Sequence, residues 1–208
     1  MIGLVDEFIF FDTAQYSRGD WRNRNRIKTA NGIIWLTIPV GRGFQSIAET
    51  LVSDPGWAER HWKTLQQSYA RAAYFDHYRS SFESLYLGSR EPYLSQVNFR
   101  FIKSICEVLG INTCLSWALD DPAGLGKTER LVQLCSRAGA TEYLSGPAAR
   151  AYLDEKLFAD AGIALQWMDY SGYPEYRQLY PPFEHRVSVL DLIFNQGPNA
   201  RLYMRSSS

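Results

Sequence analysis

The feature of the sequence that most restricts the fold is an alternation of strands and helices in its second half. Strands are predicted at 111–117, 141–144 and 163–168, and helices at 129–138 and 153–161. Gly139 and Gly162 follow the two helices, as glycine commonly does. This order is typical of a parallel sheet with right-handed crossovers. We therefore expect an α/β protein with a largely parallel sheet and flanking helices.

The first half of the chain is expected to supply further strands and helices. Phe8 to Phe11 form a short apolar run that indicates a buried strand, and 47–52 is predicted as another. Apolar spacings predict helices at 57–70, 75–86 and 92–109, with a short one near the end at 187–194. At 208 residues the chain suits a single domain spanning 1–208, whose tail at 198–208 is predicted to be frayed.

A cluster of positive charge lies beside the clearest strand. Five basic residues and one acid lie between Arg18 and Lys28, although the whole chain has 22 Lys and Arg against 22 Asp and Glu. Ala30-Asn31-Gly32 supplies the turn of a β-hairpin near the N-terminus, and 33–40 is predicted as its return strand. If 21–28 is extended, its side chains alternate between two faces. One face carries Arg22, Arg24, Arg26 and Lys28, and the other carries Trp21, Asn23, Asn25 and Ile27.

This basic hairpin has two interpretations. Four cations on one face repel each other, and the planar fork of donors on arginine suits the oxygens of a phosphate or carboxylate. An anionic ligand would relieve the repulsion, and Trp21, Asn23 and Asn25 interleave the charges. The alternative is a solvated edge strand whose charges prevent aggregation. We favour the anion site.

Further candidates lie where strands end and on a predicted helix. Asp12 follows the first strand, at the end that faces the ligand crevice in open α/β sheets, unless it caps a turn. Ser145 and Gly146 follow a later strand, where backbone amides bind an anion or a sugar hydroxyl unless the segment is a plain connection. His61 is either a proton-transfer group or an interface histidine with satisfied hydrogen bonds.

Two features near the C-terminus are also candidate parts of a binding site. The segment 170–182 is rich in tyrosine and proline and has no periodicity, so it is predicted to be a lid or pocket wall. Asp191 lies among apolar residues of the last predicted helix. Its carboxylate must therefore face solvent or meet a cation.

Composition argues against several classes of protein. Zero net charge and a pI near 6.8 argue against a general nucleic-acid-binding protein. Cys106, Cys114 and Cys135 lack CxxC spacing and are expected to be reduced core residues, so no metal site is predicted and no cofactor is identified. The first residues lack the basic region of a signal peptide, and no apolar run approaches the roughly 18 residues of a membrane span. We expect a cytoplasmic protein without a transmembrane segment.

Several motifs, taken in order, resemble the WbqC-like family over about Leu4 to Gly197. They are NRNRIKT at 23–29, WLTIPV at 35–40, HWK at 61–63, YLSGP at 143–147 with YLDE at 152–155, and SVLDLIFN at 188–195. The family is associated with bacterial O-antigen and related surface-polysaccharide biosynthesis. Its members usually begin with a strand and loop of the form His-Gln-Pro-x-Tyr-x-Pro-Trp-x-Gly. We therefore expect this chain to lack a first sheet strand and a histidine near the crevice.

The resemblance implies a cytoplasmic transferase that acts on a nucleotide-linked sugar, or on an acyl donor used to decorate one, with other polysaccharide-biosynthesis enzymes as partners. The residues expected to bind the anionic substrate are Arg22, Asn23, Arg24, Asn25, Arg26, Lys28, Lys63, Ser145, Gly146 and Tyr152. The expected catalytic residues are Asp12, His61 and Asp154. Two alternatives are an adenylate-forming or nucleotidyl-transfer enzyme, and a non-catalytic scaffold of a polysaccharide-biosynthesis complex.

Overall fold

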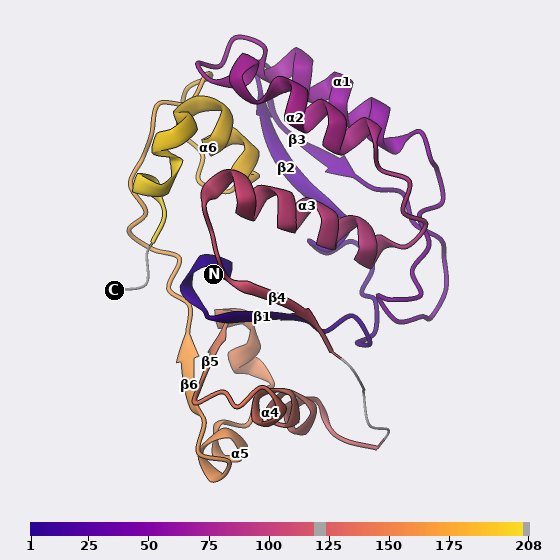
Figure 1. Cartoon of the computed structure of the whole chain (residues 1–208), viewed down its shortest axis with the longest axis vertical. Helices are drawn as coiled ribbons and strands as arrows, with labels where there is room; N and C mark the ends of the chain where they lie inside the picture. The colour runs from indigo at the N-terminus through magenta and orange to yellow at the C-terminus, as the bar shows by residue number, and fades with distance from the viewer. Residues whose placement is uncertain (119–123, 206–208) are drawn as a thin grey trace. The chain divides into compact units, whose positions relative to one another are not determined.

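The computed structural model describes residues 1–118 and 124–205, which divide into two compact units (Figure 1). The first unit holds Met1–Thr13 and Thr113–Gly172. The second holds Ala14–Asn112 and the described residues from Tyr173 onward. That the whole chain forms one domain, as the sequence suggests, stays a prediction.

Two short parallel ladders build the first unit. β1 (Glu7–Phe10) pairs with β4 (Cys114–Trp117), and β5 (Glu142–Ser145) pairs with β6 (Ala164–Trp167). Its helical elements are η1 (Ile2–Leu4), α4 (Lys127–Arg137), η2 (Pro147–Ala151) and α5 (Glu155–Asp160). Phe158 is fully buried, with its ring stacked on Tyr143 at 5.2 Å between centroids. The predicted parallel pairing is therefore confirmed for these strands.

The parallel strands do not join into the single, largely parallel sheet that the sequence predicts. Among the described residues, β1–β4 and β5–β6 are separate two-stranded sheets. Alternation of strands and helices favours parallel pairing, but it does not specify which strands share a ladder. β1 pairs with a strand that follows it only after the long segment Ala14–Asn112.

The second unit combines an antiparallel hairpin with helices. β2 (Arg24–Thr29) and β3 (Gly32–Thr37) pair from Arg24↔Thr37 to Thr29↔Gly32, so the predicted hairpin and its turn are confirmed. α1 (Trp57–Tyr69), α2 (Phe75–Leu87), α3 (Leu94–Leu109) and α6 (Val189–Gln196) correspond to the four helices predicted here. Figure 1 shows α1 and α2 packed side by side.

Aromatic side chains make much of the core of this unit. Trp62 of α1 stacks on Phe75 of α2 at 5.8 Å between ring centroids. Phe194 of α6 meets Phe75 and Phe82 edge to face, at 5.1 and 5.2 Å. Ile27 of the hairpin is fully buried in the same cluster. Because aromatic rings bury large apolar areas, these contacts contribute to holding α1, α2 and α6 together.

Two predictions of local structure in this unit are wrong. Residues 47–52 form no strand, because the backbone turns there and Thr50 N donates to Ile47 O at 3.1 Å. The tail is not frayed up to residue 205, because η3 (Gly197–Tyr203) is a 3-10 helix with Ala200 buried in the core. Residues 206–208 of the predicted tail lie outside the described part of the chain.

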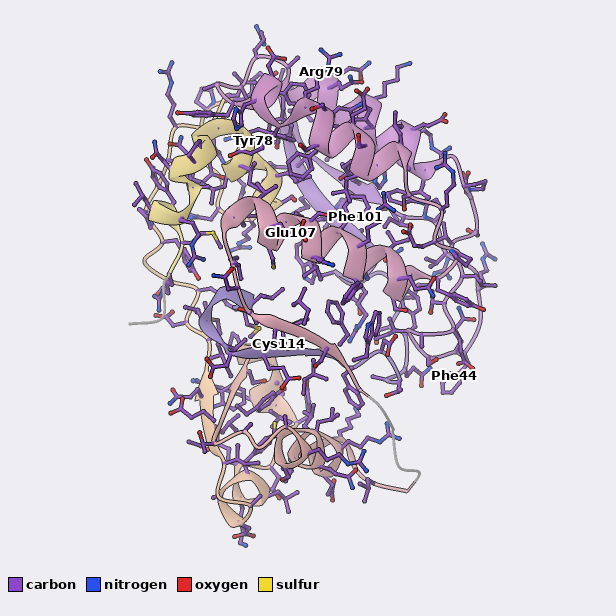
Figure 2. The ribbon with its side chains drawn as sticks, viewed as in Figure 1. Phe44, Tyr78, Arg79, Phe101, Glu107 and Cys114 are labelled. Carbon is purple, nitrogen blue, oxygen red and sulfur yellow. The ribbon has the colours of Figure 1, made fainter. Side chains whose placement is uncertain are left out.

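The three free cysteines do not share one environment. Cys106 and Cys135 are buried, as the sequence predicts. Cys114 is exposed instead, at the start of β4 (Figure 2). An end position on a short strand leaves a side chain less covered than a central one, and the apolar neighbours of Cys114 in the sequence gave no sign of this.

A glycine between α6 and η3 tests how closely the second unit is packed. Gly197 has a φ of 55°, and a Cβ added there would lie 2.4 Å from the ring of Tyr74. We expect Gly197→Ala to lower the free energy of unfolding by about 2–4 kcal/mol, because the positive φ and the close contact are both unfavourable. The control is Gly110→Ala, where φ is 62° and nothing lies within 4 Å of the added Cβ. Urea unfolding measures both variants, and equal losses would contradict this account of the packing.

Candidate anion-binding site

Two arginines of β2 lie against tryptophan rings on one face of the hairpin. Arg24 Cζ lies 4.3 Å from the centroid of the Trp35 ring, and Arg26 Cζ lies 5.7 Å from Trp35 and 5.6 Å from Trp21. The indole rings are 5.2 Å apart and are exposed, Trp21 by 62% and Trp35 by 43%. Cation–π attraction orients a guanidinium over a ring face while leaving the N–H groups at its edge available.

The basic strand is shorter than predicted, and this changes the position of Trp21. β2 begins at Arg24, because residues 18–22 are in turns. Trp21 does not lie on the face opposite the arginines, as the extended strand predicted, since its ring contacts Arg26. Arg22 also lies outside the strand.

Several polar atoms around these arginines are buried without a hydrogen-bond partner. They are the Nε atoms of Arg24 and Arg26, the Oδ1 atom of Asn23 and the hydroxyl of Tyr16. Within residues 1–118 and 124–205, no carboxylate forms an ion pair with Arg24 or Arg26. Leaving a buried polar group unpaired costs about 1–3 kcal/mol, so native proteins rarely do so. The arrangement fits a ligand whose oxygens would accept from the arginine donors.

Tyr16 adds a hydroxyl to this basic cluster. Burial raises its pKa, while the charges of Arg18, Arg22 and Arg24 act in the opposite direction. The hydroxyl is therefore protonated at neutral pH and can donate a hydrogen bond. A neutral donor beside positive charges suits an anionic oxygen.

The other hairpin residues predicted to bind substrate have structural contacts. Arg22 forms an ion pair with Asp20. Asn23 Nδ2 donates to Ile38 O at 3.0 Å, and Asn25 Oδ1 accepts from the next backbone N–H at 2.8 Å. These contacts support the hairpin, and a direct role of the three side chains in binding stays a prediction.

Lys28, the third cation on this face of β2, is engaged by the protein. It is 5% exposed, and its Nζ donates to Gln178 Oε1 at 2.6 Å and to the carbonyl of Pro182. Gln178 Nε2 in turn donates to Asp191 Oδ1 at 3.0 Å. Lys28 therefore links the strand of the arginines to a buried polar network.

Asp191 of α6 is the centre of that network and is 1% exposed. Tyr69 Oη donates to its Oδ2 at 2.9 Å, and Tyr176 Oη donates to its Oδ1 at 2.8 Å. Burial raises the pKa of Asp191, and these donors act in the opposite direction. Burial and the charge of Asp191 raise the pKa of both tyrosines, so their hydroxyls stay protonated. The sequence predicted that this carboxylate faces solvent or meets a cation, whereas it is buried and its direct partners are hydroxyl and amide groups. Because Tyr176 lies in the predicted lid segment, this part of it is held against α6.

His61 of α1 contacts the other end of the hairpin. Its Nε2 donates to Thr37 O at 3.0 Å, and its ring centroid lies 5.1 Å from that of Trp57. Burial lowers the pKa of His61 to about 4, although the hydrogen bond to Thr37 opposes the shift. The imidazole is therefore neutral at neutral pH, with one nitrogen engaged. Lys63 is exposed on the same helix.

The remaining predicted residues lie in the first unit. Asp12 is in a turn after β1. Ser145 is the buried last residue of β5, and Gly146 is the N-cap of η2. Asp154 is the N-cap of α5 and accepts a backbone hydrogen bond at 2.9 Å, whereas Tyr152 is exposed. The predicted residues thus fall into two groups in different units, and their use in one site is untested.

Sequence reasoning missed three residues around the candidate site: Tyr16, Trp35 and Gln178. A signal for Trp35 was present, because counting across the two-residue turn places it opposite Arg26. Tyr16 and Gln178 reach their positions through contacts with distant parts of the chain, and no local pattern marks them.

Within the described ranges, no three histidine, cysteine or acidic side chains are grouped to hold a metal ion. None of the helices in those ranges has the length and apolar character required to cross a membrane.

The fold and the site define a mixed α/β protein with a basic, tryptophan-lined hairpin. The chain belongs to the WbqC-like protein family, whose family model matches residues 1–203, and this confirms the resemblance seen in its motifs. It is 47% identical over 208 residues to the uncharacterized protein Rv1507c of Mycobacterium tuberculosis, covering 99% of this chain and 90% of that protein. No solved structure matches the chain.

The half-buried side chain of His61 gives a prediction for acid stability. His61 has a pKa of about 4 in the folded protein, against an ordinary value of 6.5. The unfolded chain therefore binds this proton at a higher pH than the folded protein does. The free energy of unfolding should fall as the pH decreases from 6.5 toward 4. His61→Gln, which retains a donor for Thr37 O, should reduce this acid-induced loss. The midpoint of urea unfolding at several pH values measures this loss. Identical pH profiles for the wild type and His61→Gln would refute the prediction.

The Asp191 network gives a second prediction. Asp191→Ala leaves the hydroxyls of Tyr69 and Tyr176 and the Gln178 amide without their acceptor. We expect a loss of about 3–5 kcal/mol in the free energy of unfolding. The control is Glu175→Ala, which removes an exposed carboxylate from the neighbouring segment. A loss below 1 kcal/mol, as expected for a surface charge, would show that the network is dispensable.

Proposed function

We propose that this protein is a transferase that binds an anionic activated donor, either a nucleotide-linked sugar or an acyl donor, for bacterial O-antigen or surface-polysaccharide biosynthesis. The main support is the pair Arg24 and Arg26, which lie against the exposed rings of Trp21 and Trp35 and form no ion pair with a carboxylate of the described residues. Guanidinium groups bind phosphate through two parallel hydrogen bonds, and an exposed indole offers a stacking surface for a ring. The ligand therefore combines an anionic group with a flat or ring-shaped part.

The same contacts suit a group-transfer reaction. Arginines that hold a phosphate position the donor, and they also offset negative charge that develops on the leaving group. Asp12, His61 and Asp154 are the proposed proton-transfer groups. Among them, His61 belongs to the unit that carries the arginines and contacts Thr37, the cross-strand neighbour of Arg24.

Location and partners form part of the same proposal. Membership of the WbqC-like family and the resemblance of its motifs support a role beside other polysaccharide-biosynthesis enzymes. The proposed location is the cytoplasm, where activated sugar donors are made.

The proposal is tested by calorimetric titration with UDP-glucose and, as an acyl donor, acetyl-CoA. We expect at least one donor to bind the wild type, and Arg24→Ala to weaken it at least about tenfold, because a charge-assisted hydrogen bond is lost. The melting temperature should hardly change, since Arg24 lies outside the buried core. Arg42→Ala, which removes an exposed cation from a nearby loop, is the control.

Three experimental outcomes would contradict the proposal, and each points to a different conclusion. Equal affinity of wild type and Arg24→Ala would refute the hairpin as the donor site. Release of pyrophosphate from ATP, without binding of either donor, would favour the nucleotidyl-transfer alternative. Co-purification of a polysaccharide enzyme without any small-molecule binding would favour the scaffold.

A further inference from the structure

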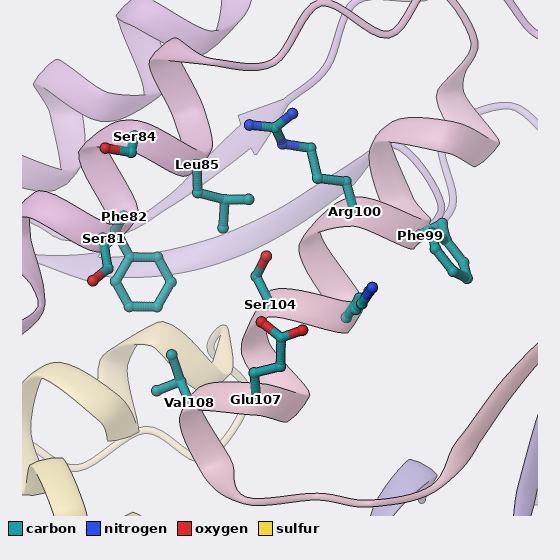
Figure 3. A pocket seen from close by; sticks show the side chains of 10 residues that line it. Ser81, Phe82, Ser84, Leu85, Phe99, Arg100, Ser104, Glu107 and Val108 are labelled. Atoms are coloured by element: carbon teal, nitrogen blue, oxygen red, sulfur yellow. The ribbon is translucent and has the colours of Figure 1, made fainter.

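A hollow of about 600 Å³ lies between α2 and α3 of the second unit. Figure 3 shows Leu85 of α2 and Ser104 of α3 directed into the space between the helices, and Arg100 reaching from α3 toward α2. The α2 face also carries Ser81 and Ser84. Because serine side chains are short, they leave between the two helices a space that larger residues would fill.

The hollow has an apolar floor and a polar rim. Phe82 and Leu85 are buried and form the floor with Val108. The polar residues are Ser81, Ser84, Arg100, Lys103, Ser104 and Glu107. Three hydroxyls that both donate and accept, one carboxylate and two cations therefore surround an apolar surface.

The two cations of the rim differ in their partners. Arg100 Nη1 donates to Glu91 Oε1 at 3.0 Å, which holds the guanidinium in place, while its Nε is buried without a partner. Lys103 is exposed, and no hydrogen bond or ion pair to another described residue engages its Nζ. One cation that is ion-paired with Glu91 and one exposed cation thus border the same hollow.

We infer that this hollow binds a monosaccharide that carries an acid group, either a phosphate or a carboxylate. A sugar has hydroxyls that match the serines and Glu107, and a C–H face that matches the apolar floor. Its acid group would accept from Arg100 and Lys103. The volume is in the range of small-molecule sites. This is a second site, independent of the donor site proposed on the hairpin.

Calorimetric titration with four probes tests the chemistry: glucose 1-phosphate, glucuronate, glucose and inorganic phosphate. We expect at least one of the two acidic sugars to bind, and to bind more tightly than glucose or phosphate. The phosphate and carboxylate probes distinguish the two acid groups. Failure of both acidic sugars to bind, or an equal affinity for inorganic phosphate, would overturn the inference.

Paired variants locate the binding. Ser84→Leu fills the hollow and should abolish binding, whereas Ser80→Leu adds the same side chain at an exposed position of α2 outside it. Lys103→Gln should weaken binding about tenfold through loss of a charged hydrogen bond, whereas Arg79→Gln removes an exposed α2 cation and should not. Melting temperatures check that each variant is folded. Equal affinities within either pair would contradict the location.

Discussion

The carboxylate of Asp191 is the group on which the arrangement of the second unit depends. A charge that is 1% exposed is strongly unfavourable in an apolar interior unless its oxygens receive hydrogen bonds. The donors come from Tyr69 of α1 and from Tyr176 and Gln178, which precede α6, and Gln178 also accepts from Lys28 of the hairpin. Segments far apart in the sequence must be in place together before the charge is satisfied, so the network favours one packing arrangement over others.

The same contacts explain why the hairpin can present its arginines in fixed positions. Tyr69 Oη accepts from the backbone N–H of Lys28 at 3.1 Å, and His61 donates to Thr37 O at 3.0 Å. Both anchors belong to α1, and they hold opposite ends of the hairpin. A ligand that meets side chains on an already rigid backbone loses less conformational entropy on binding than one that must order a loop. Arg24 pairs with Thr37 in the hairpin register, so the hydrogen bond from His61 to Thr37 O restrains the part of the backbone that carries this arginine.

Local chemistry predicted the elements better than their assembly. The turn Ala30-Asn31-Gly32 and the helical periodicities depend on near neighbours in sequence, so the hairpin and the long helices could be predicted. The partners of each strand and the contact of Gln178 with Asp191 depend on distant residues, which no pattern in a single sequence specifies. At the site, alternation identified Arg24 and Arg26 as one face. It could not show that protein groups engage the third cation.

The pairing of β1 with β4 has a consequence for the order in which the chain folds during synthesis. Glu7 is synthesised roughly a hundred residues before its ladder partner Cys114. At ordinary translation rates, β1 has no partner for about 5 to 20 seconds. By then the second unit has been synthesised up to Asn112, including its hairpin and its first three helices. Most of that unit is therefore made while β1 is still an unpaired apolar segment that a chaperone could bind.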